Sequence, residues 1–196
     1  SSHNMLLHSG ATEGINTLVK GFAFAHWKKK IDFFYSPTDH PCVRNTAKFL
    51  AQFEHRTHEM AVDHVGTFNV AELIQKIKNC PGPVLLNYTL VNNETGVAWP
   101  LEWAEKIKRE TDAFIHVDAA QAVGKVASNQ WSKELDAYTS SGHKFGAMKG
   151  VGFSFFKPSF PFMPLLHGGG QQMGKRSGTI NTPGVYSMCL ALDEHA

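Results

Sequence analysis

The feature that most constrains the fold is an alternation of short apolar runs with segments of helical periodicity. Runs of strand length occur at residues 5–7, 31–35, 60–62, 84–88, 114–117, 137–139 and 152–156. Apolar residues recur at helical spacing in residues 12–20, 70–78, 100–109 and 185–192. Strands that alternate with helices form a mostly parallel sheet with helices on both faces. The sequence therefore predicts a single α/β domain with three α/β/α layers.

Composition restricts the partners of such a domain. The 196 residues carry a formal net charge of +2 with both signs interspersed, so nothing indicates nucleic acid or an acidic membrane surface. No apolar stretch approaches the roughly 20 residues that span a bilayer. Cys42, Cys80 and Cys189 form no CxxC pair, which argues against a disulfide framework or a cysteine-rich zinc site. We expect a small-molecule partner and a reducing cytoplasm or organelle matrix.

The histidines do not indicate a metal centre. His55, His58 and His64 resemble surface residues that lack the carboxylate or cysteine partners of a zinc site. We therefore expect no metal ligands in this chain.

The last third of the chain has a different character. Residues 157–164 are rich in proline and aromatic side chains, and three glycines follow at 168–170, which excludes regular helix or central strand there. We expect the aromatic stretch 153–162 to be an exposed patch that favours a dimer or aggregation. In the final helix, Cys189 is expected on the buried face.

Two segments predict an anion site. Residues 9–14, Ser-Gly-Ala-Thr-Glu-Gly, follow the first apolar run and open a helix, where backbone amides and the helix dipole attract a phosphate. The alternative is an ordinary helix start capped by Ser9 or Thr12. Residues 141–143, Ser-Gly-His, offer a second hydroxyl and amide set directly before Lys144. Two donor sets beside one lysine favour the phosphate interpretation.

Lys144 and Asp118 predict the chemistry. A lysine amine forms a Schiff base with an aldehyde, and an acid beside a pyridine nitrogen keeps that ring protonated as an electron sink. Asp118 follows the apolar run 114–117, at the edge where open α/β sheets bind ligands, although it also suits a helix cap. Together with the phosphate donors, this pair predicts pyridoxal 5'-phosphate as the cofactor.

Three further polar residues are candidates for the same site. Gln121 is suited to the ring oxygen of the cofactor, unless it lies on a solvated face. His40 is a candidate catalytic residue, because an imidazole can stack on the ring or move protons. An amide from the run Asn92-Asn93 is suited to the substrate carboxylate or the ring oxygen, but Asn-Glu-Thr-Gly at 93–96 is also typical of a turn.

The ordered motifs resemble the class V aminotransferase superfamily and, within it, the cysteine desulfurases of the NifS and IscS type. The resemblance rests on residues 9–14, 91–96, 116–121, 141–144, 167–172 and 176–184. It implies the large domain of a fold type I transferase that depends on pyridoxal 5'-phosphate. It also implies a homodimer in which Thr179 reaches the phosphate of the neighbouring subunit's cofactor.

The resemblance implies a role for each matching position. The phosphate ligands would be Ala11, Thr12, Ser141 and His143, the ring contacts His40, Asn93, Asp118 and Gln121, and the Schiff-base residue Lys144. The family reaction converts L-cysteine to L-alanine and passes sulfur as a persulfide to an acceptor protein, for iron–sulfur clusters or thiolated tRNA.

The chain departs from the family pattern at both ends. We expect residues 1–196 to be the large domain alone, without the N-terminal arm and without the small domain that carries the persulfide cysteine and the arginine for the substrate carboxylate. Cys42 stands at a helix start whose dipole would lower its pKa, but structural roles are favoured for all three cysteines. The alternatives are a selenocysteine lyase or another class V enzyme, and a non-catalytic binding module.

Overall fold

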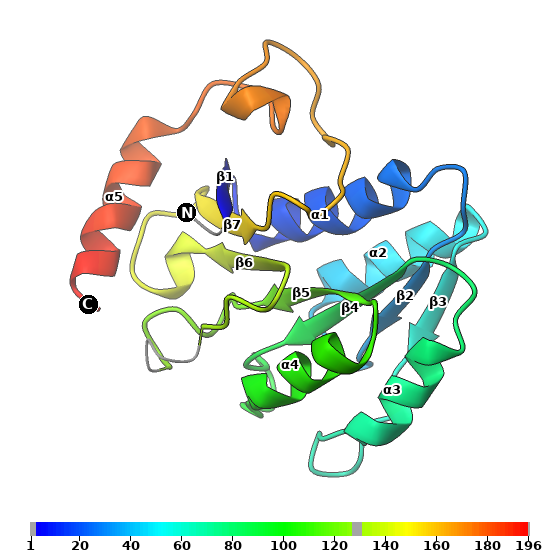
Figure 1. The fold of residues 1–196 in the computed structure, drawn as a ribbon. Helices are drawn as coiled ribbons and strands as arrows, with labels where there is room; N and C mark the ends of the chain where they lie inside the picture. The colour runs from blue at the N-terminus through cyan, green and yellow to red at the C-terminus, as the bar shows by residue number, and fades with distance from the viewer. Residues whose placement is uncertain (1–2, 127–130, 196) are drawn as a thin grey trace.

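The chain folds around one seven-stranded sheet (Figure 1). The computed structural model describes residues 3–126 and 131–195. The strands are β1 (Asn4–His8), β2 (Asp32–Tyr35), β3 (Arg56–Glu59), β4 (Val84–Thr89), β5 (Phe114–Asp118), β6 (Ala137–Ser141) and β7 (Gly152–Phe156), in the spatial order β1-β7-β6-β5-β4-β2-β3. Only β7 runs against its neighbours β1 and β6, so the predicted mostly parallel sheet is confirmed.

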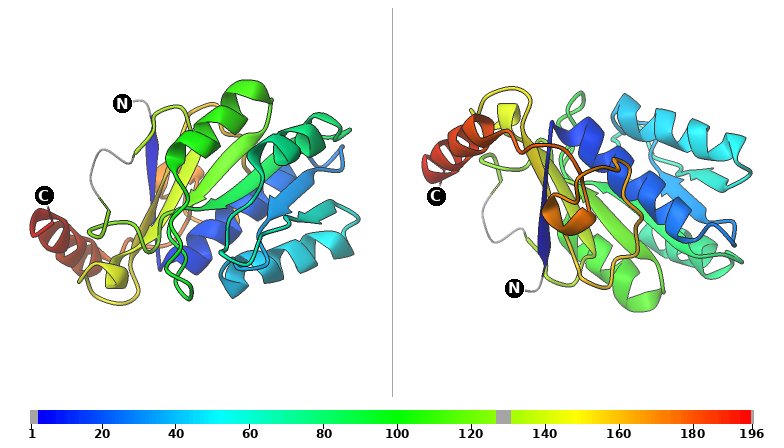
Figure 2. Two further views of the ribbon diagram at one scale, coloured as in Figure 1. Left: turned by 90° about the horizontal axis from the view of Figure 1, so that it is seen from below. Right: turned by 90° about the horizontal axis from the view of Figure 1, so that it is seen from above.

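Helices cover both faces of the sheet, which confirms the predicted three layers (Figure 2). The helices are α1 (Ala11–Ala25), α2 (Pro41–Gln52), α3 (Val70–Lys78), α4 (Leu101–Glu110) and α5 (Thr182–Asp193). The buried faces of α1 and α2 share one core cluster with β2, and those of α3 and α4 share a second with β4 and β5. No helix in the described parts of the chain has both the length and the apolarity that crossing a membrane takes.

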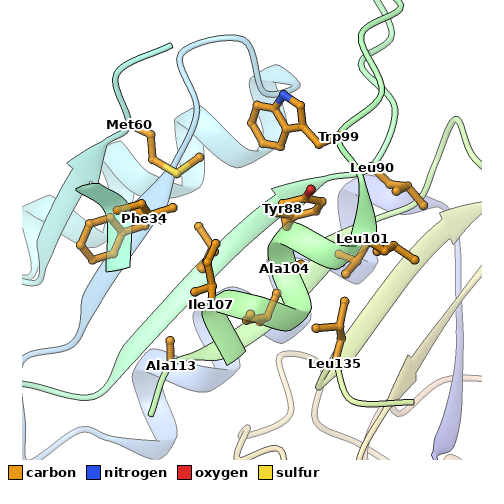
Figure 3. Packing of buried hydrophobic residues seen from close by; sticks show 14 of the residues in the cluster. Phe34, Met60, Tyr88, Leu90, Trp99, Leu101, Ala104, Ile107, Ala113 and Leu135 are labelled. Carbon is orange, nitrogen blue, oxygen red and sulfur yellow. The ribbon is translucent and has the colours of Figure 1, made fainter. Parts of the chain in front are cut away.

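The middle of the sheet is its most completely buried part. All six residues of β4 are buried, as the continuous apolar run predicts for a central parallel strand. On one face, α4 turns Leu101, Ala104 and Ile107 onto the sheet (Figure 3). Trp99, just before that helix, packs edge-on against Tyr88 and donates a 2.8 Å hydrogen bond to the carbonyl of Gly66. This packing holds the segment after β4 against the sheet.

The strand expected at 60–62 is wrong in position, because the strand lies about one strand length earlier in the chain. The structure has β3 at Arg56–Glu59 instead, paired with β2 only. An edge strand is half exposed, so its Arg-Thr-His-Glu sequence carries no apolar run to reveal it. The apolar signal at Met60 marks the residue just beyond the strand, where its side chain is buried and its amide donates to the carbonyl of Tyr35 at 2.8 Å.

The expected exposed aromatic patch at 153–162 is also wrong. Phe153, Phe156, Phe160 and Phe162 are between 3 and 7 % exposed. After β7 the chain turns back along α1, and the aromatic rings fill the space beside that helix. Exposed large apolar side chains in the segments that follow include Met163, Leu166, Met173, Tyr186 and Leu190. Cys189 is exposed as well, so the expectation that it lies on a buried helix face is wrong.

Gly14 allows α1 to lie close to the sheet. A Cβ atom added there would stand 2.3 Å from Nε2 of His8 and 2.7 Å from Cγ2 of Thr139. Both neighbours are buried strand residues, so neither can move away without disturbing the core.

We expect Gly14→Ala to lower the free energy of unfolding by about 1–3 kcal/mol, because an added methyl group overpacks this contact. Chemical denaturation of both proteins measures the difference. Alanine is the better helix former by about 1 kcal/mol, so a gain in stability would contradict the close contact.

Candidate cofactor site

A cavity of about 400 Å³ opens where the parallel strands end. Its walls come from the starts of α1 and α2 and from the segments that follow β4, β5 and β6. Nine of the ten predicted site residues line it: Ala11, Thr12, His40, Asn93, Asp118, Gln121, Ser141, His143 and Lys144. The tenth, Thr179, lines a separate small pocket with Leu7 and Arg176. Its predicted role at a neighbouring subunit stays a prediction.

The start of α1 forms one wall of the cavity without a side-chain cap. Gly10 is the N-cap residue, so the alternative of capping by Ser9 or Thr12 does not describe this helix. Glu13 instead accepts a 2.8 Å hydrogen bond from the amide of Ser9 and a 2.7 Å hydrogen bond from Nε of Arg176. Burial would raise the pKa of Glu13, but these hydrogen bonds from Arg176 and Ser9 lower it to about 2. The loop before α1 is thus held in shape by an ion pair.

Ser141 and His143 bring a second set of donors to the same end of the cavity. The hydroxyl of Ser141 lies 3.0 Å from Nδ1 of His143 and near Gly10 of the first set. Partial burial lowers the pKa of His143, and the cationic Lys144 and Lys149 lower it further. Both lysines also line the cavity, so this end has the charge that an anion needs.

Lys144 ends a short 3₁₀ turn, η1 (Gly142–Lys144), directly after β6. Its side chain is exposed to the cavity. Within residues 3–126 and 131–195, its ammonium group has no hydrogen-bond or ion-pair partner. Once this group has lost its proton, the free amine can add to a carbonyl carbon.

Asp118 lines the same cavity as the last residue of β5. It is 5 % exposed, and one carboxylate oxygen accepts a 3.0 Å hydrogen bond from the amide of Ala120. Burial raises the pKa of this carboxyl group, and neither the Ala120 amide nor His40 offsets the rise. A protonated ring nitrogen would supply the positive partner that this buried carboxylate needs.

The remaining predicted residues surround Asp118. His40 is the N-cap of α2, where Nδ1 accepts a 3.2 Å hydrogen bond from the amide of Cys42. Gln121 is half-buried, and its oxygen accepts a hydrogen bond from Lys125. Both residues line the cavity.

The two asparagines at 92 and 93 have different roles. Asn92 is buried and builds the turn: its oxygen accepts from the amides of Glu94 and Thr95, and its nitrogen donates to the carbonyl of Thr38. Asn93 is exposed and lines the cavity. The turn interpretation therefore holds for Asn92, and the binding role predicted for Asn93 stays a prediction.

The cavity also contains residues that the sequence did not reveal. Thr89 is the register partner of Asp118 on the neighbouring strand, and Cys42 is the second residue of α2. Burial raises the pKa of the Cys42 thiol to about 12, with Asp118 adding to the rise. The expectation that the helix dipole lowers this pKa is wrong, because burial outweighs it. Pairing between β4 and β5 places Thr89 in the cavity wall, and the packing of α2 places Cys42 there.

His58 has partners that the sequence did not reveal. Its Nε2 lies 2.8 Å from a carboxylate oxygen of Asp32, and the thiol of Cys80 is close enough that all three potential ligand atoms lie within 4.8 Å of one another. Arg56 already binds both oxygens of Asp32 at 2.7 Å, which neutralises the carboxylate. The expected lack of partners is thus wrong, and the group is an ion-pair network on the α3 side of the sheet.

The residues of the cavity fit pyridoxal 5'-phosphate by their chemistry. The cationic end suits a phosphate, the unpartnered amine of Lys144 suits an aldehyde, and the buried carboxyl of Asp118 suits a ring nitrogen. These three features line one cavity.

Comparisons with known proteins agree with this arrangement. The sequence model of the family described as aminotransferase class-V matches residues 1–195. The chain is 34% identical over 192 residues to the cysteine desulfurase IscS of Rickettsia prowazekii, covering 97% of this chain and 46% of the relative. It is 35% identical over 185 residues to a cysteine desulfurase of Nostoc sp., covering 94% of this chain and 46% of the relative.

Solved structures show the same likeness. A NifS-like protein superposes with a TM-score of 0.90 at 34% identity, over 97% of this chain and 52% of the other. SspA in complex with cysteine superposes with a TM-score of 0.88 at 30% identity, over 96% and 55% of the two chains. The chain thus spans about half the length of the relatives it matches. It belongs to the class V aminotransferase family and has the fold of its cysteine desulfurase-like members.

Proposed function

We propose that residues 1–196 form the cofactor-binding large domain of a cysteine desulfurase-like enzyme that uses pyridoxal 5'-phosphate. The observation that carries this proposal is the convergence of nine predicted residues, Lys144 and Asp118 among them, on one cavity. The relatives named cysteine desulfurase support the substrate class.

Each predicted residue of the cavity has a proposed task. The phosphate is bound by Ala11, Thr12, Ser141 and His143. Asp118 holds a proton on the ring nitrogen, and His40 stacks on the ring. The ring oxygen is bound by Gln121 and Asn93. The cofactor, when bound, supplies an electron sink for bonds broken at the substrate's α- and β-carbons. Lys144 holds the cofactor covalently.

The proposed substrate is L-cysteine, which is converted to L-alanine with transfer of sulfur as a persulfide. A relative of known structure, SspA, is in complex with cysteine. The protonated, buried thiol of Cys42 is poorly suited to accept sulfur, and Cys80 and Cys189 lie outside the cavity lining. We therefore propose that a cysteine of the parent enzyme beyond these 196 residues receives the sulfur and passes it to an acceptor protein. The isolated chain would have little desulfurase activity.

We propose a homodimer as the working assembly. Thr179 is exposed and lies outside the cavity of its own chain, as a residue that serves a neighbouring site must be. Exposed Met173 and Tyr186 lie on the same loop and on the following helix α5. Three unpaired cysteines agree with a reducing compartment, and we propose the cytoplasm.

We expect the chain to retain pyridoxal 5'-phosphate after desalting and to show the visible absorbance of a lysine-bound cofactor. Lys144→Ala removes the reacting amine, so that band should be lost. Lys149→Ala, five residues along in the same cavity wall, is the matched control and should keep the band. Retention of an unchanged band by Lys144→Ala would contradict the proposal.

We expect Cys42 to react slowly with iodoacetamide at pH 7.5, because a thiol with a pKa of about 12 is almost entirely protonated there. Bound cofactor should slow the reaction further, since it would cover the cavity wall. Peptide mass spectrometry compares Cys42 with the exposed Cys189 in one sample. Alkylation of Cys42 at the rate of Cys189, with or without cofactor, would be the contradictory result.

A further inference from the structure

A continuous line of buried side-chain hydrogen bonds crosses the sheet beneath the cofactor cavity. It passes through six residues that are each no more than 4 % exposed: His8, Ser154, Thr139, His116, Asn87 and Asp39. The successive donor–acceptor distances are 3.0, 2.8, 2.8, 2.8 and 2.9 Å. We refer to these six residues as the His8–Asp39 network. It joins the loop before α1 to the residue before His40.

The two ends of the network fix the direction of its hydrogen bonds. At one end, the amide of Gly10 donates to Nδ1 of His8, so Nε2 of His8 carries the proton and donates to Ser154. At the other end, the carboxylate of Asp39 accepts from the side-chain nitrogen of Asn87, which leaves the oxygen of Asn87 to accept.

Only one proton arrangement of the middle residues satisfies both ends. Nδ1 of His116 must donate to the oxygen of Asn87, so Nε2 of a neutral His116 must accept from the hydroxyl of Thr139. Thr139 in turn accepts from Ser154. Burial lowers the pKa of His116 to about 3, which agrees with a neutral ring at physiological pH. Every donor in the network therefore points toward Asp39.

Asp39 receives more donors than the network alone supplies. Its carboxylate also accepts from the amide of Ser36 at 3.0 Å and from the hydroxyl of Thr89 at 2.6 Å. A carboxyl group surrounded only by donors is bound in its ionised form. Burial raises its pKa to about 6, and the neighbouring Asp118 contributes to the rise. Ionised Asp39 is thus an unneutralised charge one hydrogen bond behind Thr89, which lines the cavity.

We propose that the His8–Asp39 network positions Asp39 as a second buried anion of the cofactor site, where its charge stabilises the positively charged ring of bound pyridoxal 5'-phosphate. This inference rests on the proposed function. Asp39 does not line the cavity, so it is a positioning residue that acts through Thr89 and Asp118. The other titratable groups that respond to Asp39 are Cys42 of α2 and Tyr35 of β2.

The reciprocal effect follows from thermodynamic linkage. A cationic ring near Asp39 stabilises its ionised form, so ionised Asp39 must strengthen binding of the protonated ring by the same factor. Loss of the charge should weaken cofactor binding on the order of tenfold. It should also lower the pH midpoint of the visible absorbance change of the bound cofactor by about one unit, because removing an anion destabilises a nearby cation.

The first test needs no cofactor. Long-range ¹H–¹⁵N correlation spectra of the chain labelled at histidine report which ring nitrogen of His116 carries the proton. We expect His116 to be neutral with the proton on Nδ1 at every pH from 5 to 8. A proton on Nε2, or titration of His116 within that range, would overturn the arrangement of the network.

The second test compares Asp39→Asn with Asp136→Asn as the matched control. Asp136 is 2 % exposed, lies just before β6 and pairs with Lys108, so its replacement removes a buried carboxylate away from the cavity. We expect weaker cofactor binding and a lower absorbance midpoint for Asp39→Asn but not for Asp136→Asn. An unchanged midpoint in Asp39→Asn would overturn the role of its charge.

A third variant covers the case in which Asp39→Asn does not fold. Thr89→Val keeps the shape of the cavity wall but removes one donor to Asp39, so the midpoint should move in the same direction by a smaller amount. An unchanged midpoint there, with binding intact, would also overturn the inference. If the unmodified chain shows no cofactor band at all, the proposed function fails and the role of Asp39 fails with it. The His116 spectra still decide the network independently.

Discussion

The site depends on parallel pairing of the central strands. Thr89 at the end of β4 pairs in register with Asp118 at the end of β5, and Asp118 with Thr139 of β6, so the segments after these strands emerge side by side. Burial of β4 between two helical layers holds that alignment. Residues separated by tens of positions in sequence thereby become neighbours around one cavity.

Groups of opposite charge line the cavity. Lys144 and Lys149 supply positive charge near His143, while Asp118 supplies a buried carboxyl group. A phosphate-bearing ring with a basic nitrogen complements both kinds of group at once. The His8–Asp39 network places a second carboxyl group behind the cavity wall. Asp39 accepts hydrogen bonds there from three donors. Packing and polar chemistry are connected here, since Gly14 leaves the space that His8 occupies in the network.

The sequence predicted the central elements well and the margins poorly. Buried strands such as β4 carry continuous apolar runs, and α3 has the predicted bounds because its apolar stripe and its Asn69 cap coincide. The position predicted for the edge strand β3 was wrong because a half-exposed strand needs no apolar run. The exposure predicted for the aromatic residues at 153–162 was wrong, because composition does not reveal that the chain turns back onto α1.

The candidate site follows the same division. Residues in local motifs, such as Ser141 to Lys144, were predictable because neighbouring positions carry the signal. Thr89 and the His8–Asp39 network were not, since their partners are distant in sequence and meet through sheet register. The place of Cys42 in the cavity wall was not predictable either, because it depends on how α2 packs. The pKa of Cys42 was misjudged for a related reason: the helix start was visible in the sequence, but the burial that outweighs its dipole was not.

The central claim is that Lys144 is the amine that receives the cofactor. Borohydride reduction of the chain mixed with pyridoxal 5'-phosphate fixes the cofactor to its lysine, and peptide mass spectrometry then locates the added mass. The account predicts the modification on Lys144 and not on Lys149, although both line the cavity. Modification of Lys149 alone, or of scattered surface lysines with Lys144 unmodified, would contradict it.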